Sequence, residues 1–184
     1  MAAALRLLAL LGLVLAISGC LGSSEEIFGA DQAVAVPGVE GDYVQKDGGS
    51  QDILRLERIA GTSDYTFFNP KAADKDRMRL RAVSAGGDLY LLQIRDETWP
   101  AGRYWHVLVR VERENNTVAR VVVLFPEDDA LLALTAKSGV ELGPPGEGDA
   151  YGPKTLVGSR EAVAAFLKKM PTLPLREIGS YVKT

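Results

Sequence analysis

Cysteine and histidine are almost absent from this chain of 184 residues, which has one of each, Cys20 and His106. A single cysteine cannot form an intramolecular disulfide, so packing alone has to hold the fold together. Catalysis by a Cys–His pair and metal sites built from Cys and His both need more of these residues. The sequence also lacks a Gly-x-Ser-x-Gly elbow, a phosphate-binding glycine loop and a His-Glu-x-x-His helix. We therefore predict a protein that is not an enzyme and that holds no metal or cofactor.

Neither sign of charge dominates, since 21 lysines and arginines face 24 acidic residues and the net charge is −3. A nucleic-acid-binding face would be clearly basic, so we predict no nucleic-acid partner. Acidic residues cluster at 74–76 and 127–129, but neither cluster has the spaced oxygens and fixed glycine of a calcium loop. We interpret the clusters as a solvated loop and a helix start. A carboxylate pair assembled only by the fold is the one catalytic arrangement left open.

The N-terminus carries the longest uncharged apolar run. Arg6 precedes the apolar residues 7–17, and the small residues Ser18 and Gly19 follow before Cys20. A basic start, an apolar middle and small residues at the end are typical of a secretory signal peptide. At ~1.5 Å per residue the apolar run spans about half of the ~30 Å hydrocarbon core of a bilayer, which is too short for a transmembrane helix.

The tetrapeptide Ile17-Ser18-Gly19-Cys20 resembles the lipobox of bacterial lipoproteins. The resemblance implies that residues 1–19 are a signal peptide, that Cys20 is diacylated and that its new amino terminus is acylated. Acyl chains such as palmitate would then anchor the protein in the membrane outside the cytoplasm. Residues 20–26 would form the lipidated cysteine and a flexible tether. Leu21 stands where an Asp would favour the inner membrane, which implies the outer membrane, facing the periplasm, in a Gram-negative host.

Short strand-like runs separated by Gly- and Asn-containing turns fill the first two thirds of the chain. The pair Asn115-Asn116 tolerates positive φ and predicts a two-residue hairpin, with Val109 opposite Val122. Trp105, Val107, Val109 and Val111 would then share a face with Arg120, Val122 and Leu124. The seven predicted strands are Gly41–Gln45, Ile53–Ala60, Tyr65–Asn69, Arg77–Ser84, Leu89–Arg95, Tyr104–Glu114 and Val118–Phe125.

Two helices and a docked tail complete the predicted fold. One helix opens at Glu127 after Pro126 and stops at Gly139. The second is capped by Ser159, ends at Pro171 and places Val163, Phe166, Leu167 and Met170 on one face. Residues 143–149 read as a loop, Lys154–Val157 as a candidate eighth strand, and the residues after Pro171 as a docked tail. We predict that residues 27–184 form a single mostly β domain, an antiparallel seven- to eight-stranded meander closed as a barrel or half-barrel, with the C-terminal helix packed on it.

This order of elements resembles the lipocalins, and Gly41-Asp42-Tyr43 on the first strand is similar to their Gly-x-Trp start, with Tyr43 in place of the Trp. The resemblance implies a barrel that holds one small apolar ligand or is filled by its own side chains. We name Trp99, Tyr104 and Trp105, which surround one turn, as candidate ligand-binding residues. Core packing and anchoring of the turn is the alternative interpretation of these rings.

Two functions follow for a membrane-anchored envelope lipoprotein. In the first, the barrel binds a small apolar or lipid ligand. In the second, the core is filled and the protein is a structural or interaction module that contacts an envelope protein. Its contact surface would be the aromatic turn or the basic strand face of Arg77, Arg79 and Arg81, which is otherwise an ordinary solvated face. An apolar cavity of ~300 Å³ or more would favour the first function.

Overall fold

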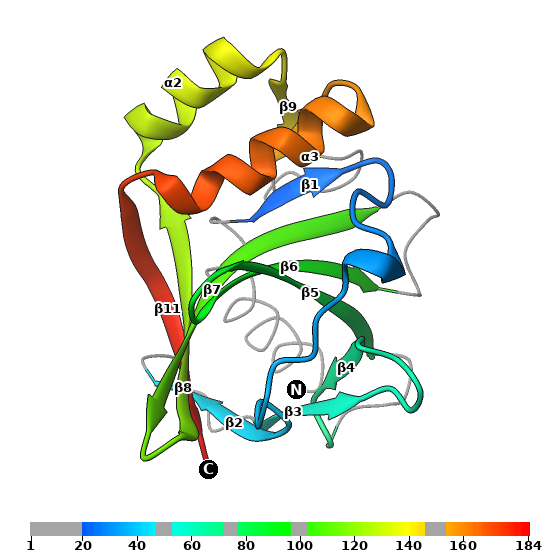
Figure 1. Cartoon of the computed structure of the whole chain (residues 1–184), viewed down its shortest axis with the longest axis vertical. Helices are drawn as coiled ribbons and strands as arrows, with labels where there is room; N and C mark the ends of the chain where they lie inside the picture. The colour runs from blue at the N-terminus through cyan, green and yellow to red at the C-terminus, as the bar shows by residue number, and fades with distance from the viewer. Residues whose placement is uncertain (1–19, 47–52, 72–76, 97–102, 146–153) are drawn as a thin grey trace, which may run out of the picture.

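The computed structural model describes residues 20–46, 53–71, 77–96, 103–145 and 154–184 (Figure 1). Eight antiparallel strands form a closed barrel, because β6 pairs both with β5 and with β7. This confirms the predicted fold class. The barrel strands are β2 (Gly41–Gln45), β3 (Ile53–Arg58), β4 (Tyr65–Phe68), β5 (Met78–Gly86), β6 (Leu89–Asp96), β7 (Tyr104–Glu114), β8 (Thr117–Pro126) and β11 (Leu175–Lys183).

The eighth barrel strand is not Lys154–Val157, the candidate from the sequence. Lys154–Val157 does form a strand, β10, but β10 lies outside the barrel. The tail residues Leu175–Lys183 instead form β11, which is inserted between β8 and β2. Closure of the barrel therefore depends on the last ten residues of the chain.

Three short strands extend the sheet beyond β7. Strand β1 (Leu21–Ser23) pairs with the first residues of β7, β10 pairs with β1, and β9 (Glu141–Pro145) pairs with β10. Two expectations change here. Gly143–Pro145 belong to β9 rather than to a loop, while residues 146–149 lie outside the described residues. The predicted tether of residues 20–26 begins with the fully buried strand β1, so Cys20 is followed at once by ordered structure.

Helices α2 (Asp128–Ser138) and α3 (Arg160–Lys169) follow their sequence signals. Ser159 caps α3 through its Oγ, which accepts a hydrogen bond from the backbone N–H of Ala162 at 3.2 Å. Gly139 ends α2 at φ 67°, a left-handed conformation that glycine adopts without strain. Helix α3 lies across the outside of the barrel, over β1 and the upper edge of the sheet (Figure 1).

The β7–β8 hairpin has the predicted turn but a different register. Asn115 and Asn116 have φ of 50° and 64°, as a type I′ turn requires, and Glu114 pairs with Thr117. A bulge then shifts the register at Glu112/Arg113, so Val109 pairs with Val123 and not with Val122. Because side chains alternate along a strand, this one-residue shift reverses the faces of β8. The predicted face with Arg120, Val122 and Leu124 beside Trp105, Val107, Val109 and Val111 was wrong.

The barrel wall separates two apolar cores. The lumen core, inside the barrel, includes Tyr43, Tyr65, Val107 and Val123. The outer core, between the barrel wall and the covering layer of α3 and the N-terminal segment, includes Phe28, Phe166 and Leu167, each 0 % exposed. Cys20 belongs to the lumen core and its neighbour Leu21 to the outer core. The chain therefore enters the barrel wall at this point.

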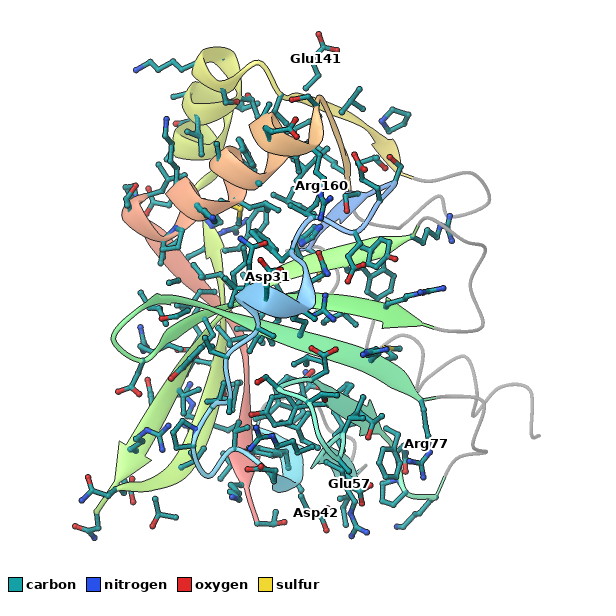
Figure 2. All side chains as sticks on the ribbon, turned by 45° about the vertical axis from the view of Figure 1, so that its right-hand side comes forward. Asp31, Asp42, Glu57, Arg77, Glu141 and Arg160 are labelled. Carbon is teal, nitrogen blue, oxygen red and sulfur yellow. The ribbon has the colours of Figure 1, made fainter. Side chains whose placement is uncertain are left out.

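Polar side chains bind the segment after β1 to the outside of the barrel. Gln93 on β6 accepts hydrogen bonds from the backbone N–H groups of Ile27 and Phe28 at 2.9 and 3.0 Å, and donates to the Phe28 carbonyl at 3.1 Å. Arg160 on α3 donates to the Ile27 carbonyl from the other side (Figure 2). These bonds satisfy buried backbone groups that the sheet leaves without partners.

The predicted basic strand face is largely neutralised. Arg81 is buried, donates to both carboxylate oxygens of Asp64 at 2.8 Å and pairs with Glu26. Arg79 donates to Asp64 as well, at 2.7 Å, and the Arg77 guanidinium lies 3.9 Å over the Phe68 ring. Burial alone would raise the pKa of Asp64, but the hydrogen bonds from Arg81 and Arg79 hold it below its usual value. Asp64 therefore stays charged and holds Arg81, which in turn binds Glu26 and the Phe28 carbonyl of the covering segment.

Candidate functional site

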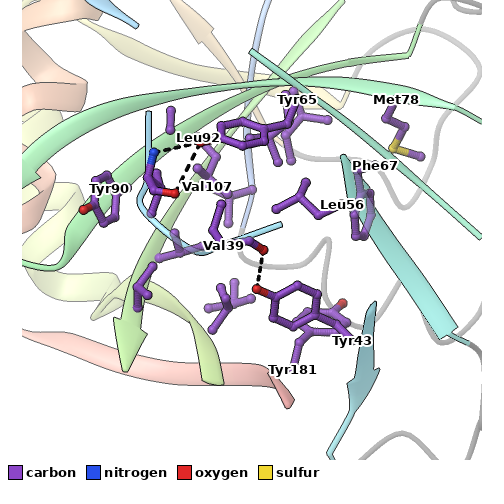
Figure 3. Close-up of a pocket in the computed structure, with 18 of the residues that line it drawn as sticks. Val39, Tyr43, Leu56, Tyr65, Phe67, Met78, Tyr90, Leu92, Val107 and Tyr181 are labelled. Atoms are coloured by element: carbon purple, nitrogen blue, oxygen red, sulfur yellow. Dashed lines mark hydrogen bonds between the residues drawn. The ribbon is translucent and has the colours of Figure 1, made fainter. Parts of the chain in front are cut away.

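An apolar cavity of about 150 Å³ lies inside the barrel (Figure 3). Every barrel strand contributes to its wall, and none of its lining side chains is Asp, Glu, Lys or Arg. The cavity is smaller than the ~300 Å³ at which ligand pockets usually begin. It is comparable to an engineered apolar cavity of 150 Å³ that stays dry and binds benzene. The lining residues are Cys20, Val36, Val39, Tyr43, Leu56, Tyr65, Phe67, Met78, Leu80, Ala82, Tyr90, Leu92, Ile94, Trp105, Val107, Val109, Val111, Val121, Val123 and Tyr181.

Strand alternation explains why these side chains meet. On β7, every second residue from Trp105 to Val111 faces the cavity, and Leu80 and Ala82 do the same on β5. On β8 the bulge places Val121 and Val123 in the cavity wall. Without it, continued alternation from Val118 would place Arg120 there.

Residues 33–40, which we call the strap, close one end of the barrel. The strap lies at the end that carries the β7–β8 turn and the C-terminus, because Arg113 donates to the Pro37 carbonyl and Lys183 to the Gly38 carbonyl. Two lining tyrosines bind the strap from inside the barrel (Figure 3). The Tyr65 hydroxyl accepts from the backbone N–H of Val36 at 2.7 Å, and the Tyr43 hydroxyl donates to the Val39 carbonyl.

Four titratable groups in the cavity wall, Cys20, Tyr43, Tyr65 and Tyr181, are neutral at ordinary pH. Burial raises the pKa of the Cys20 thiol to about 12. Burial, together with the nearby Glu40, raises the pKa of Tyr43 to about 12. Burial also raises the pKa of Tyr65 and of Tyr181, and Tyr181 is near enough to Cys20 for a thiolate there to raise its pKa further. The cavity therefore favours an uncharged, apolar occupant and disfavours an ionised group.

The three candidate aromatic residues have different positions. Trp105 is buried and lines the cavity. Tyr104 directly precedes Trp105 on β7, does not line the cavity, and has the Arg95 guanidinium 5.8 Å from its ring centre. Trp99 lies outside the described residues. Cys20, predicted as the lipidation site, has its side chain in the cavity wall and is 7 % exposed.

His106 is a structural residue of the outer core, not part of the cavity. It is 0 % exposed, lies 2.9 Å through Nε2 from the Ser23 hydroxyl and packs edge-on against Phe28. The Ser23 hydroxyl donates to the Glu25 carbonyl, so Nε2 carries the proton and Nδ1 is left without a partner. Burial lowers the pKa of His106 to about 3, so the ring is neutral.

Sequence reasoning missed the tyrosines that hold the strap. Tyr43 was noted only for its likeness to a lipocalin position, and Tyr65 only as the first residue of a strand. One signal was available: a Val-rich segment around Pro37 that precedes the first long strand without a strand pattern of its own. Its ambiguous pattern fits a segment that crosses the barrel end and is bound by side chains rather than by a ladder of backbone bonds.

Comparisons with known proteins name no relative: no family model, no curated protein and no solved structure matches this chain. Within the part of the chain that the structure describes, no helix has the length and apolar character needed to cross a membrane. The same residues contain no group of three or more His, Cys, Asp or Glu side chains placed to hold a metal ion.

Proposed function

We propose that this chain is a membrane-anchored envelope lipoprotein, without enzymatic activity, whose barrel binds a small apolar or lipid ligand. The observation that carries the proposal is the apolar, uncharged cavity inside a closed eight-stranded barrel. At about 150 Å³ the cavity favours a slender ligand, or one segment of a longer molecule, over a bulky one.

The lipobox-like tetrapeptide supports the anchoring part of the proposal. Cys20 would attack the glycerol carbon of a phospholipid that carries the headgroup. The S–H bond and the C–O bond to the headgroup phosphate break, an S–C bond forms, and the proton leaves with the released headgroup. Hydrolysis of the Gly19–Cys20 bond would then free the amine, and a phospholipid ester would acylate it. Cys20 is buried and its thiol stays protonated in the folded barrel, so this chemistry has to precede docking of β1.

The alternative is a structural or interaction module with no ligand. Its specific support is the small cavity, which is below the usual size of ligand pockets. Its proposed basic contact surface is less favoured, because Arg79 and Arg81 both pair with Asp64.

Two measurements on the full chain test the proposal. Bacteria that process lipoproteins should incorporate labelled palmitate into the wild-type protein and not into Cys20→Ser. The unlipidated Cys20→Ser chain should bind one molecule of benzene, with a saturable heat of binding in titration calorimetry.

A cavity-filling variant provides the control for benzene binding. Ala82, which lines the cavity, is replaced by phenylalanine in the Cys20→Ser background, and the matched control is Ala136→Phe on the exposed face of α2. Ala82→Phe should abolish benzene binding and Ala136→Phe should leave it unchanged. Absence of saturable benzene binding in a folded Cys20→Ser chain would favour the interaction module. Palmitate incorporation into Cys20→Ser would refute the anchoring part.

A further inference from the structure

The position of Cys20 in the cavity wall indicates what occupies the cavity. Cys20 lines the cavity, and the next residue, Leu21, pairs with His106 in the sheet and is 1 % exposed. No flexible segment lies between Cys20 and the first paired residue, Leu21. A group attached to that sulfur therefore starts at the cavity wall and not at the end of a flexible segment.

We propose that one acyl chain of the lipid carried by Cys20 occupies the cavity of its own barrel. The inference rests on the proposed function, because it needs Cys20 to be lipidated, and it names the ligand of the same cavity. The wall has the chemistry of a hydrocarbon site, since its side chains are apolar or neutral throughout. A tethered chain also has a high effective concentration at this site, which disfavours free competitors.

Burial of the amino terminus supports the same arrangement. Cys20 is 7 % exposed in the uncleaved chain, so the first residue after the predicted cleavage site already belongs to the wall. Acylation of its nitrogen would leave no charge beside this apolar wall.

Tyr181 provides a polar partner beside the sulfur. Its side chain lines the cavity on β11 and lies close to Cys20. A phenol hydroxyl can donate a hydrogen bond to an ester carbonyl of a thioether-linked diacylglyceryl group. Tyr43 and Tyr65 are already bound to the strap and are not needed for this contact.

The volume of the cavity limits how much of the acyl chain it holds. A cavity of about 150 Å³ takes a group the size of benzene, so the glyceryl carbons, the ester and only the first carbons of the acyl chain enter it. The strap closes one end, so the rest of the chain has to leave through the opposite end, where β2, β4 and β6 finish. The second acyl chain of the same lipid stays in the bilayer.

Photo-crosslinking tests the inference in the full, lipidated chain. Bacteria that process lipoproteins would be fed palmitate analogues with a diazirine either near the carboxyl end or near the methyl end. After irradiation of intact membranes, mass spectrometry of peptides would locate the crosslinks. We expect the carboxyl-end probe to label lumen residues such as Val107 and Tyr181. The methyl-end probe should label phospholipid.

The outcomes separate the inference from the proposed function. Lipid attached at Cys20 with crosslinks from both probes only to phospholipid would overturn the inference and leave the lipoprotein intact. No label at Cys20 would overturn both. Ala82→Phe should remove the lumen crosslinks while Ala136→Phe retains them. If Ala82→Phe does not fold, a second variant decides: with Tyr181→Phe, the carboxyl-end crosslinks should shift away from β11, and an unchanged pattern would contradict the role of Tyr181.

Benzene binding gives an independent readout. The lipidated wild-type chain should bind benzene far more weakly than unlipidated Cys20→Ser, because its cavity is occupied. Equal binding by the two chains would contradict an occupied cavity.

Discussion

The two faces of the barrel wall are both apolar but are packed differently. The outer face of β5–β7 is covered by Phe28 and α3, and several of its contacts, Phe166 and Leu167 among them, are completely buried. The inner face encloses a cavity of about 150 Å³. The difference indicates that the covering layer holds the curved wall in place from outside, so that the inside need not be filled. The predictions below test this division of roles.

The largest effect is expected from the outer core. Phe166→Ala removes a ring that is 0 % exposed and should lower the free energy of unfolding by about 3–5 kcal/mol. Phe67→Ala in the cavity wall should cost less, because Phe67 is only half-buried and already faces empty space. Denaturant titration of both full-length variants measures the difference. Equal losses would contradict the idea that the outer core holds the wall.

The second prediction concerns the Asp64 cluster of Asp64, Arg81 and Glu26, in which Arg81 joins the covering segment to the wall. Asp64→Asn leaves the buried Arg81 with Glu26 as its only charged partner among the described residues, and should destabilise the fold by about 3–5 kcal/mol. Asp42→Asn, which breaks the more exposed pair with Arg55, is the control and should change little. If the two variants unfold at the same denaturant concentration, the Asp64 cluster does not hold the two layers together.

The third prediction is a pH dependence located in the outer core. His106 has a pKa of about 3 when folded and near 6.5 when unfolded, so the unfolded state binds more protons between these values. Stability should therefore fall as the pH decreases below 6.5, by about 1.4 kcal/mol per pH unit. His106→Phe should flatten this part of the profile, measured by thermal unfolding from pH 7 to pH 4. An unchanged slope in the variant would assign the acid sensitivity to other groups.

The smallest effect on stability is expected inside the barrel. Filling a packed core usually costs about 1–3 kcal/mol, but Ala82→Phe adds its ring to a wall that borders empty space. We expect a change below about 1 kcal/mol, together with loss of benzene binding. Thermal unfolding and benzene titration of the same sample test both parts. A large loss of stability would mean that the lumen is packed as tightly as the outer core.

Local signals in the sequence predicted much of the wall. Asn115-Asn116 predicted the turn that forms, and the ends of β2, β7 and β10 lie at the predicted residues. Strand β11 was missed because a bulge between Glu177 and Gly179 interrupts its alternation, which leaves Leu175, Ile178 and Tyr181 spaced by three. The bulge in β8 likewise caused the wrong face to be predicted for Arg120, Val122 and Leu124. Both errors arise because one unpaired residue reverses a period of two without changing composition.

The candidate site was less predictable than the fold. The local pattern around Cys20 predicts lipidation, which stays a prediction; the position of Cys20 in the cavity wall depends on the pairing of β1 with β7, residues more than 80 positions away. The existence of empty space inside the barrel depends on how all eight strands pack, and no sequence pattern encodes it. Whether Trp99, Tyr104 and Trp105 bind a ligand stays a prediction, with Trp105 the one that reaches the cavity.

The bulge in β8 contains one extra residue, Ala119, which has no partner residue on β7. Val118 faces the interior, and after the bulge Val121 does so again, three positions later instead of two. Regular pairing of all residues after Val118 would instead place Arg120 opposite Val111 and turn its guanidinium toward the apolar interior. Leaving Ala119 unpaired prevents this. Deletion of Ala119 would remove the bulge without moving any other pair, so Arg120 would stay outside and Val121 inside.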